Sequence, residues 1–154
     1  MSTLSNNLAR VKPSPTIAMS TLATQMKSEG CDIISLSAGE PDFDTPDHIK
    51  NAAIEAIRSG QTKYTDPDGM KILKDAVCEK FEVENDLIYH PNQISIGTGG
   101  KQILYNALVA TLNPGDEVII PAPYWVSYPD MVLLAGGQPI FIEASAKNLS
   151  LIHI

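Results

Sequence analysis

The fold is decided by residues 92–108, which read Asn-Gln-Ile-Ser-Ile-Gly-Thr-Gly-Gly-Lys-Gln-Ile-Leu-Tyr-Asn-Ala-Leu. Ile94 and Ile96 alternate with other residues in the way that is typical of a short strand, predicted at 94–97. From about residue 100 to 112 the apolar residues recur at helical spacing. Glycines separate the two patterns. The stretch therefore predicts a strand, a glycine turn and a helix, in that order.

The glycine turn is the first candidate site. Gly97, Gly99 and Gly100 permit backbone angles that side chains forbid. Such a turn presents free N–H groups at the positive end of the helix, where an anionic phosphate binds well. Lys101 adds a cation at the same place. The residues match neither the G-x-G-x-x-G fingerprint nor a Walker loop. On this local pattern, a phosphate site and a plain strand-to-helix turn with a surface lysine both remain open.

Length and composition narrow the class of protein. A chain of 154 residues with 44% apolar and 19% charged residues forms one globular domain or most of one. A net charge of −7 without a basic stripe argues against nucleic acid and anionic membranes as main partners. No apolar run is long enough to span a bilayer, and residues 1–10 lack the apolar stretch of a signal peptide. Cys31 and Cys78 have no metal-ligand spacing, so we expect no metal site and the reduced cysteines of a cytoplasmic protein.

Upstream of the glycine turn the pattern predicts an arm and three helices. Residues 1–15 contain two prolines and are expected to form the arm, and residues 1–30 are expected to lie apart from the α/β layer of residues 47–146. Thr16 and Thr45 are the expected helix N-caps. The helices are predicted over 17–29, from Pro46 to Gly60 and around 72–81, with a short strand at 33–36 and loops at 39–46 and 61–69. The charged residues of the third helix are expected on its solvated face: Lys71, Lys74, Asp75, Glu79, Lys80 and Glu82.

Downstream of the glycine turn the pattern alternates again. Short apolar strands are predicted at 117–120 and 139–143, with a helix over 125–135 between them. Because strands that alternate with helices imply right-handed crossovers, these two strands and the one at 94–97 are expected to be mutually parallel. Ligands of such sheets bind at the carboxyl ends of the strands. That rule places the glycine turn and Trp125 at one edge, where the indole ring could stack on a flat ligand.

Several segments along the chain match one family in order and spacing. They are Arg10 to Ser14, Ser37 to Pro46, Lys63 and Tyr64, Gly97 to Gln102, Asn113 to Val118, and Pro121 to Pro129. Together they resemble the fold-type I, pyridoxal-phosphate-dependent aminotransferases, and among these the aspartate/prephenate aminotransferases of the class I beta subgroup, over about residues 8–146. The resemblance implies an α/β fold: the three-layer large domain of this family with its parallel sheet (mixed in the full family), incomplete here, preceded by an N-terminal arm and helix.

The resemblance also implies domain boundaries. Residues 1–46 would be the N-terminal arm and a portion of the small domain. Residues 47–146 would be part of the large domain that binds pyridoxal phosphate. Residues 147–154 do not continue the family pattern and are expected to be a truncated or non-native tail, so His153 is not proposed as catalytic.

Pyridoxal 5′-phosphate is the cofactor that the resemblance implies. Gly99, Gly100 and Lys101 would form the phosphate turn, chiefly through backbone N–H groups, and Trp125 would stack on the pyridine ring. Tyr64 is similar to the tyrosine that reaches the phosphate across the interface of a homodimer. The resemblance thus assigns the glycine turn to a phosphate.

The implied substrates are aspartate or glutamate and a 2-oxo acid, with prephenate as a further acceptor. Gly39 would lie beside the α-carboxylate of the substrate, together with Trp125. Lys12, Thr16 and Lys101 are similar to the positions that help receive a second carboxylate. A cation suits that task because a carboxylate that leaves water needs a paired charge.

No catalytic residue is assigned in this chain. The lysine that holds the cofactor covalently belongs to a later part of the family pattern, and no lysine here has the matching Ser-x-x-Lys context. This chain alone is therefore expected to be inactive. Three alternatives stay open. One is a nucleotide-binding module, although no acidic residue follows the strand at 117–120 to hold a ribose. The others are a non-catalytic relic of the fold, and a lyase or racemase of the same fold.

Overall fold

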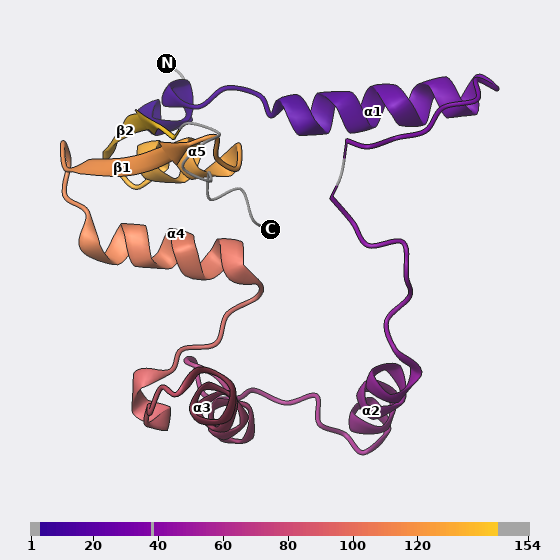
Figure 1. Cartoon of the computed structure of the whole chain (residues 1–154), viewed down its shortest axis with the longest axis vertical. Helices are drawn as coiled ribbons and strands as arrows, with labels where there is room; N and C mark the ends of the chain where they lie inside the picture. The colour runs from indigo at the N-terminus through magenta and orange to yellow at the C-terminus, as the bar shows by residue number, and fades with distance from the viewer. Residues whose placement is uncertain (1–3, 38, 145–154) are drawn as a thin grey trace. The chain divides into compact units, whose positions relative to one another are not determined.

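The computed structural model describes residues 4–37 and 39–144, so the tail at 147–154 lies outside the described residues (Figure 1). Contacts group the chain into two units, one made of residues up to Glu40 and from Leu104 onward, the other of Pro41–Ile103. No helix in the described part of the chain is both long and apolar enough to cross a membrane. The elements are η1 (Asn6–Arg10), α1 (Pro15–Ser28), α2 (Asp47–Arg58), α3 (Lys71–Asn85), η2 (Pro91–Gln93), α4 (Gly100–Thr111), β1 (Glu117–Ala122), α5 (Ser127–Leu134) and β2 (Gln138–Glu143).

The first unit is built on two parallel strands. β1 pairs with β2 in a register that sets Glu117 opposite Gln138, and α5 connects the strands and packs against both. Buried side chains from β1 and α5 form the core: Ile120, Met131 and Val132. Parallel strands need a crossover connection, which α5 supplies. The predicted α/β class and the parallel pairing of these two strands are therefore confirmed.

The N-terminal arm is attached to α5. Nη1 of Arg10 donates to the carbonyl oxygen of Leu133 at 2.9 Å, and Nη2 donates to that of Gly137 at 3.0 Å. The last carbonyls of a helix lack intrahelical partners, and a cation is favourable there. The expectation that residues 1–30 lie apart from the α/β layer is wrong for η1, which packs against α5. Such a long-range contact has no local signal in the sequence.

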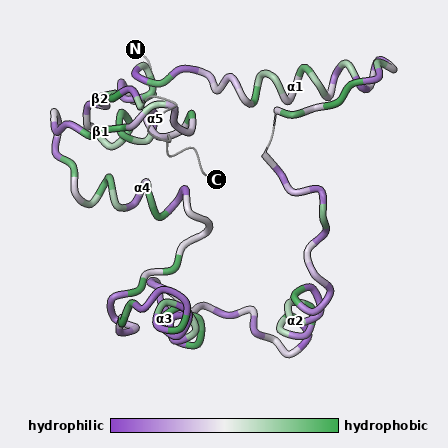
Figure 2. The backbone as a smooth tube through the Cα atoms, in the orientation of Figure 1, coloured by the Kyte–Doolittle hydropathy of each residue, from purple (hydrophilic) through white to green (hydrophobic). Residues whose placement is uncertain are grey.

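Helix α1 begins earlier than predicted. Pro15 stands in its first turn, and Oγ of Ser14 accepts a hydrogen bond from the N–H of Ile17 at 3.5 Å. Thr16 therefore lies inside the helix and is not its N-cap. The mostly apolar segment 33–36 does not form the predicted strand (Figure 2). Among the described residues it has no strand partner, and the hydroxyl of Ser37 contacts that of Ser20 at 3.1 Å instead.

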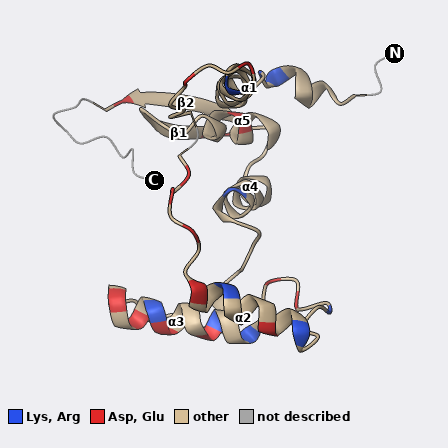
Figure 3. Cartoon of the chain, turned by 90° about the vertical axis from the view of Figure 1, so that its right-hand side faces the viewer, with Lys and Arg blue, Asp and Glu red and all other residues tan. Residues whose placement is uncertain are grey.

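The second unit contains α2, α3 and η2. Helix α2 begins at Asp47, with Pro46 as its N-cap and no side-chain cap, so Thr45 is not the cap that the sequence predicted. Instead, Lys50 forms two ion pairs at the start of the helix. Its Nζ lies 2.9 Å from Oδ1 of Asp47 and 3.0 Å from Oδ2 of Asp44. Figure 3 shows both signs of charge along α2 and α3.

The predicted strand at 94–97 is not formed, and this corrects the expected set of three parallel strands. Among the described residues the sheet consists of β1 and β2 alone. Ile94 has an extended backbone, with φ −109° and ψ 130°. The N–H of Ile96, however, donates to the carbonyl oxygen of Asp68 in a turn, at 2.9 Å. Since a strand exists only as a member of a ladder, an alternating pattern does not suffice to form one.

Candidate functional site

The glycine turn joins this extended segment to α4. The N–H of Gly99 donates to the carbonyl oxygen of Gly97 at 2.9 Å, and the N–H of Thr98 donates to Oε1 of Gln102. Gly99 has φ +82°, which L side chains rarely adopt. Gly97 is required for space, because a Cβ there would lie 2.5 Å from Cδ1 of Ile103. The turn is therefore short and closed, a side chain at position 99 would be strained, and one at position 97 would displace the side chain of Ile103.

Gly100 opens α4 and has neither constraint, since its φ is not positive and a Cβ there would meet open space. We predicted that all three glycines adopt backbone angles that side chains forbid, and of the three only Gly99 does so. The first N–H groups of a helix have no intrahelical acceptor and carry partial positive charge. The first turn of α4 has no acidic residue, and Lys101 is exposed there. These groups fit a phosphate.

A buried lysine lies in the same unit. Lys74 in α3 is only 7% exposed, and its Nζ donates to Oδ2 of Asp68 in the preceding turn. This hydrogen bond from the ammonium lowers the pKa of the Asp68 carboxyl from its ordinary value of 3.8. The interpretation of Lys74 as part of the solvated face is therefore wrong.

The signal that could have placed Lys74 is its position along α3. Val77, Cys78 and Phe81 follow it by three, four and seven residues, and all three are partly buried. Such residues share one stripe of a helix. A cation on the inward stripe needs an acidic partner, and Asp68 lies in the turn before the helix.

Tyr64 lies in the loop between α2 and α3 and is fully exposed, with 107% relative exposure. No packing within this unit occupies its ring. The phenol is therefore exposed to solvent.

The other predicted site residues belong to the first unit. Trp125 follows β1 in the connection to α5 and is 43% exposed. Its neighbour Tyr124 stacks on Phe141 of β2, with ring centroids 5.0 Å apart and an interplanar angle of 18°. This stacking anchors the connection to the sheet. It leaves the indole partly open at the carboxyl end of β1, where parallel sheets bind ligands.

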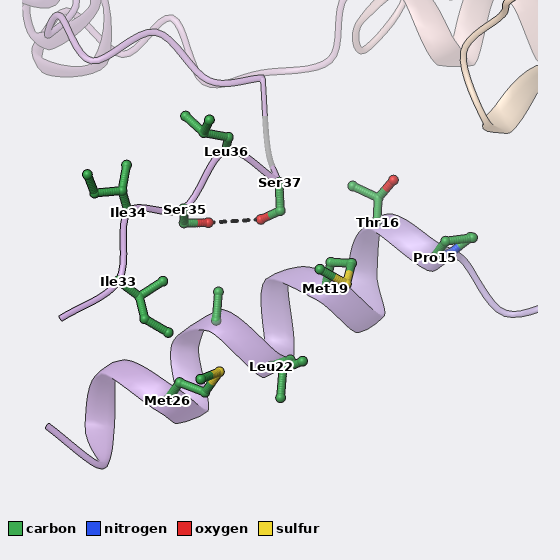
Figure 4. A pocket seen from close by; sticks show the side chains of 11 residues that line it. Pro15, Thr16, Met19, Leu22, Met26, Ile33, Ile34, Ser35, Leu36 and Ser37 are labelled. Carbon is green, nitrogen blue, oxygen red and sulfur yellow. Dashed lines mark hydrogen bonds between the residues drawn. The ribbon is translucent and has the colours of Figure 1, made fainter. Parts of the chain in front are cut away.

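A groove between α1 and residues 33–37 contains one more of the predicted residues (Figure 4). Thr16 is partly buried and lines this groove together with Ser37. Lys12 and Gly39 are exposed. The remaining lining is mostly apolar: Pro15, Met19, Leu22, Ala23, Met26, Ile33, Ile34, Ser35 and Leu36.

The structure thus brings Gly99, Gly100 and Lys101 together in one turn of the second unit, which also contains Tyr64. The first unit contains four others: Lys12, Thr16, Gly39 and Trp125. Among the described residues no cluster of three or more His, Cys, Asp or Glu side chains could hold a metal ion.

The model of the family described as aminotransferase class I and II matches residues 31–151, which is most of the chain. The chain therefore belongs to the class I and II aminotransferases. Two curated relatives are named aspartate/prephenate aminotransferase. That of Cereibacter sphaeroides is 68% identical over 148 residues, 96% of this chain and 37% of the relative. That of Nitrosomonas europaea is 57% identical over 145 residues, 94% of this chain and 36% of the relative. The chain thus spans little more than a third of these relatives.

Solved structures place the fold in the same family. The aspartate aminotransferase from Thermus thermophilus with maleate has a TM-score of 0.91 and 46% identity, and the match covers 96% of this chain and 39% of that one. The aspartate aminotransferase from Rhizobium meliloti has a TM-score of 0.88 and 48% identity, and the match covers 96% of this chain and 37% of that one. These similarities confirm the aminotransferase fold that the resemblance implied, of which this chain forms a part.

Proposed function

We propose that a full-length protein carrying this sequence transfers an amino group between aspartate or glutamate and a 2-oxo acid, with prephenate as a further acceptor. Its cofactor would be pyridoxal 5′-phosphate. The observation that carries the proposal is the glycine turn at the start of α4 with Lys101 beside it, because such a helix start suits a phosphate ester. The names of the two relatives support aspartate and prephenate as substrates.

Residues of this chain would bind and orient the cofactor. Gly99 and Gly100 would offer backbone N–H groups to its phosphate, and Lys101 an ammonium. Trp125 would stack on the pyridine ring, and Tyr64 would reach the phosphate bound by the partner in a homodimer. Once bound, the cofactor supplies the electron sink that amino transfer needs.

The substrate would be recognised through its two carboxylates. Gly39 and Trp125 would lie near the α-carboxylate, and Lys12, Thr16 and Lys101 would receive the second one. Lys12 and Lys101 are exposed, and neither has an acidic partner within 4.0 Å in the part of the chain that the structure describes. An exposed lysine without an internal partner is available to a carboxylate of a ligand.

We also infer that the 154-residue chain by itself is inactive, since it lacks a lysine in the context that holds the cofactor covalently. A cytoplasmic location is proposed with it, supported by the free thiols of Cys31 and Cys78. The domain boundaries near residues 46 and 146 remain a prediction.

The test is a chimera in which the aligned residues of the Cereibacter sphaeroides relative are replaced by those of this chain. We expect the chimera to bind pyridoxal phosphate and to turn over aspartate with 2-oxoglutarate, and with prephenate as acceptor. Turnover of neither pair would refute the proposed substrates, and a chimera that folds without binding the cofactor would refute the proposed site. The 154-residue chain, reduced with borohydride in the presence of the cofactor, should retain none of it on a lysine.

A further inference from the structure

The pair of buried Lys74 and exposed Asp68 lies at the centre of a network in the second unit. The Nζ of Lys74 donates to Asp68, and only 7% of Lys74 is exposed. A buried ammonium is costly unless it is paired, so this contact determines where the turn at Asp68 can lie relative to α3. The pair therefore holds the turn before α3 against the helix.

The same turn also contacts the segment that precedes the glycine turn. The carbonyl oxygen of Asp68 accepts the N–H of Ile96 at 2.9 Å. Gly69, with φ +111°, lies so close that a Cβ there would be 2.5 Å from Cγ1 of Ile96. One backbone hydrogen bond and one close packing contact thus connect the turn to Ile96.

Only two residues, Gly97 and Thr98, separate Ile96 from Gly99. Gly97 packs against Ile103 without room for a Cβ, and the N–H of Thr98 is held by Gln102. Such a short run has little freedom to absorb a displacement of Ile96. A shift of the turn at Asp68 would therefore reach the first N–H groups of α4.

We propose that Lys74 is a positioning residue. Acting through Asp68 and Ile96, it holds the glycine turn in the geometry that binds the phosphate of the cofactor. The inference rests on the proposed function, because it takes pyridoxal phosphate as the ligand of this turn. Lys74 does not touch the ligand. It aligns the donors that do, and donors held in the productive geometry bind more tightly than donors that must first be ordered.

Binding of pyridoxal phosphate to the chimera, measured as a dissociation constant, tests the inference. Lys74→Met is expected to weaken binding by about 10- to 100-fold, the effect of misaligning one charge-assisted hydrogen bond. Lys74→Arg keeps the cation and should restore most of the affinity. Lys71→Met is the matched control, because Lys71 forms an exposed pair with Asp75 at 2.6 Å on the same helix.

Hydrogen exchange of the cofactor-free chimera provides a readout that does not depend on activity. In Lys74→Met the N–H groups of residues 96–99 should exchange at least about tenfold faster than in the control. If Lys74→Met does not fold, Asp68→Asn serves in its place, since it removes the charge of the partner and keeps a hydrogen-bonding group.

The outcomes separate the two proposals. An unsubstituted chimera that folds but does not bind the cofactor refutes the proposed function. An unsubstituted chimera that binds it, while Lys74→Met and Asp68→Asn bind equally well and exchange at the control rate, refutes the positioning role alone. Weaker binding that Lys74→Arg does not restore would also overturn the role assigned to the cation.

Discussion

Nη1 of Arg10 donates a hydrogen bond of 2.9 Å to the carbonyl oxygen of Leu133, which lies 123 residues further along the chain. Nη2 of the same side chain donates to Gly137, just before β2. One guanidinium thus connects η1 to the end of α5 and to the entry of β2. Acceptors at a helix end are suited to this cation, because the last carbonyls of a helix have no partner within it.

Replacement of Arg10 by Met should therefore loosen the arm. We expect the free energy of unfolding of the chimera to fall by about 1–3 kcal/mol, since two hydrogen bonds from a charged donor are lost. Urea unfolding measures this loss, and thermolysin should cleave the arm faster. Arg58→Met is the control, because Arg58 in α2 has no ion-pair partner among the described residues. An equal effect of both substitutions would contradict the assigned role of Arg10.

The glycines of the turn should differ in their tolerance of alanine. Gly99→Ala forces a side chain onto φ +82° and is expected to destabilise the chimera by about 1–2 kcal/mol. Gly97→Ala should do so as well, because its Cβ would collide with Ile103. Gly100→Ala should change stability little, since a Cβ there meets open space. Thermal unfolding measures the stability of the three variants. A Gly100→Ala variant as unstable as Gly99→Ala would be inconsistent with this geometry.

The pair of Asp68 and Lys74 should make stability depend on pH at the acid end. The pKa of Asp68 is lowered from 3.8 in the folded state by the ammonium of Lys74. Its contribution is therefore present above about pH 3.8 and is lost as the pH falls through the lower folded value. Urea unfolding of the chimera between about pH 2 and 6 should show a steeper acid limb than that of Asp68→Asn. Parallel curves for the two proteins would show that the pair adds no such dependence.

The core of the first unit should be sensitive to cavities. Val132 in α5 has 2% exposure, whereas Val109 in α4 has 53%. Val132→Ala is expected to lower the free energy of unfolding by about 1–3 kcal/mol, because buried methyl groups are lost and a cavity remains. Val109→Ala should have an effect of less than about 0.5 kcal/mol. Both are measured by urea unfolding, and equal losses would mean that Val132 is not part of the core.

Lys12 provides a test of the proposed second-carboxylate site. Lys12→Met in the chimera should lower kcat/KM for aspartate by about 10- to 100-fold, because one charge-assisted hydrogen bond to the substrate is lost. The kcat/KM for alanine, which has no second carboxylate, should not change. Lys27→Met in the last turn of α1 is the control, as Lys27 is exposed. A parallel loss with alanine would mean that Lys12 does not recognise that carboxylate.

The sequence by itself determined the helices from α2 to α5 to within a few residues, and the two strands that flank α5. Helical periodicity, turn residues and short apolar runs are local properties, so they can be recognised without a partner. The glycine turn before α4 was found in the same way, and the resemblance then supplied the ligand that the local pattern had left open.

Only the tertiary structure decided which of these local tendencies were realised. The segment 94–97 alternates as a strand does, but Ile96 pairs with Asp68 in a turn, and a ladder needs a neighbouring strand. Lys74 reads as a surface charge, yet its carboxylate partner allows it to be buried. Arg10 reads as part of a free arm, and its acceptors lie more than a hundred residues away. The partners of Ile96 and Arg10 are distant in sequence, so no local pattern predicts them. Asp68 lies six residues before Lys74, and there the inward stripe of α3 is the local signal.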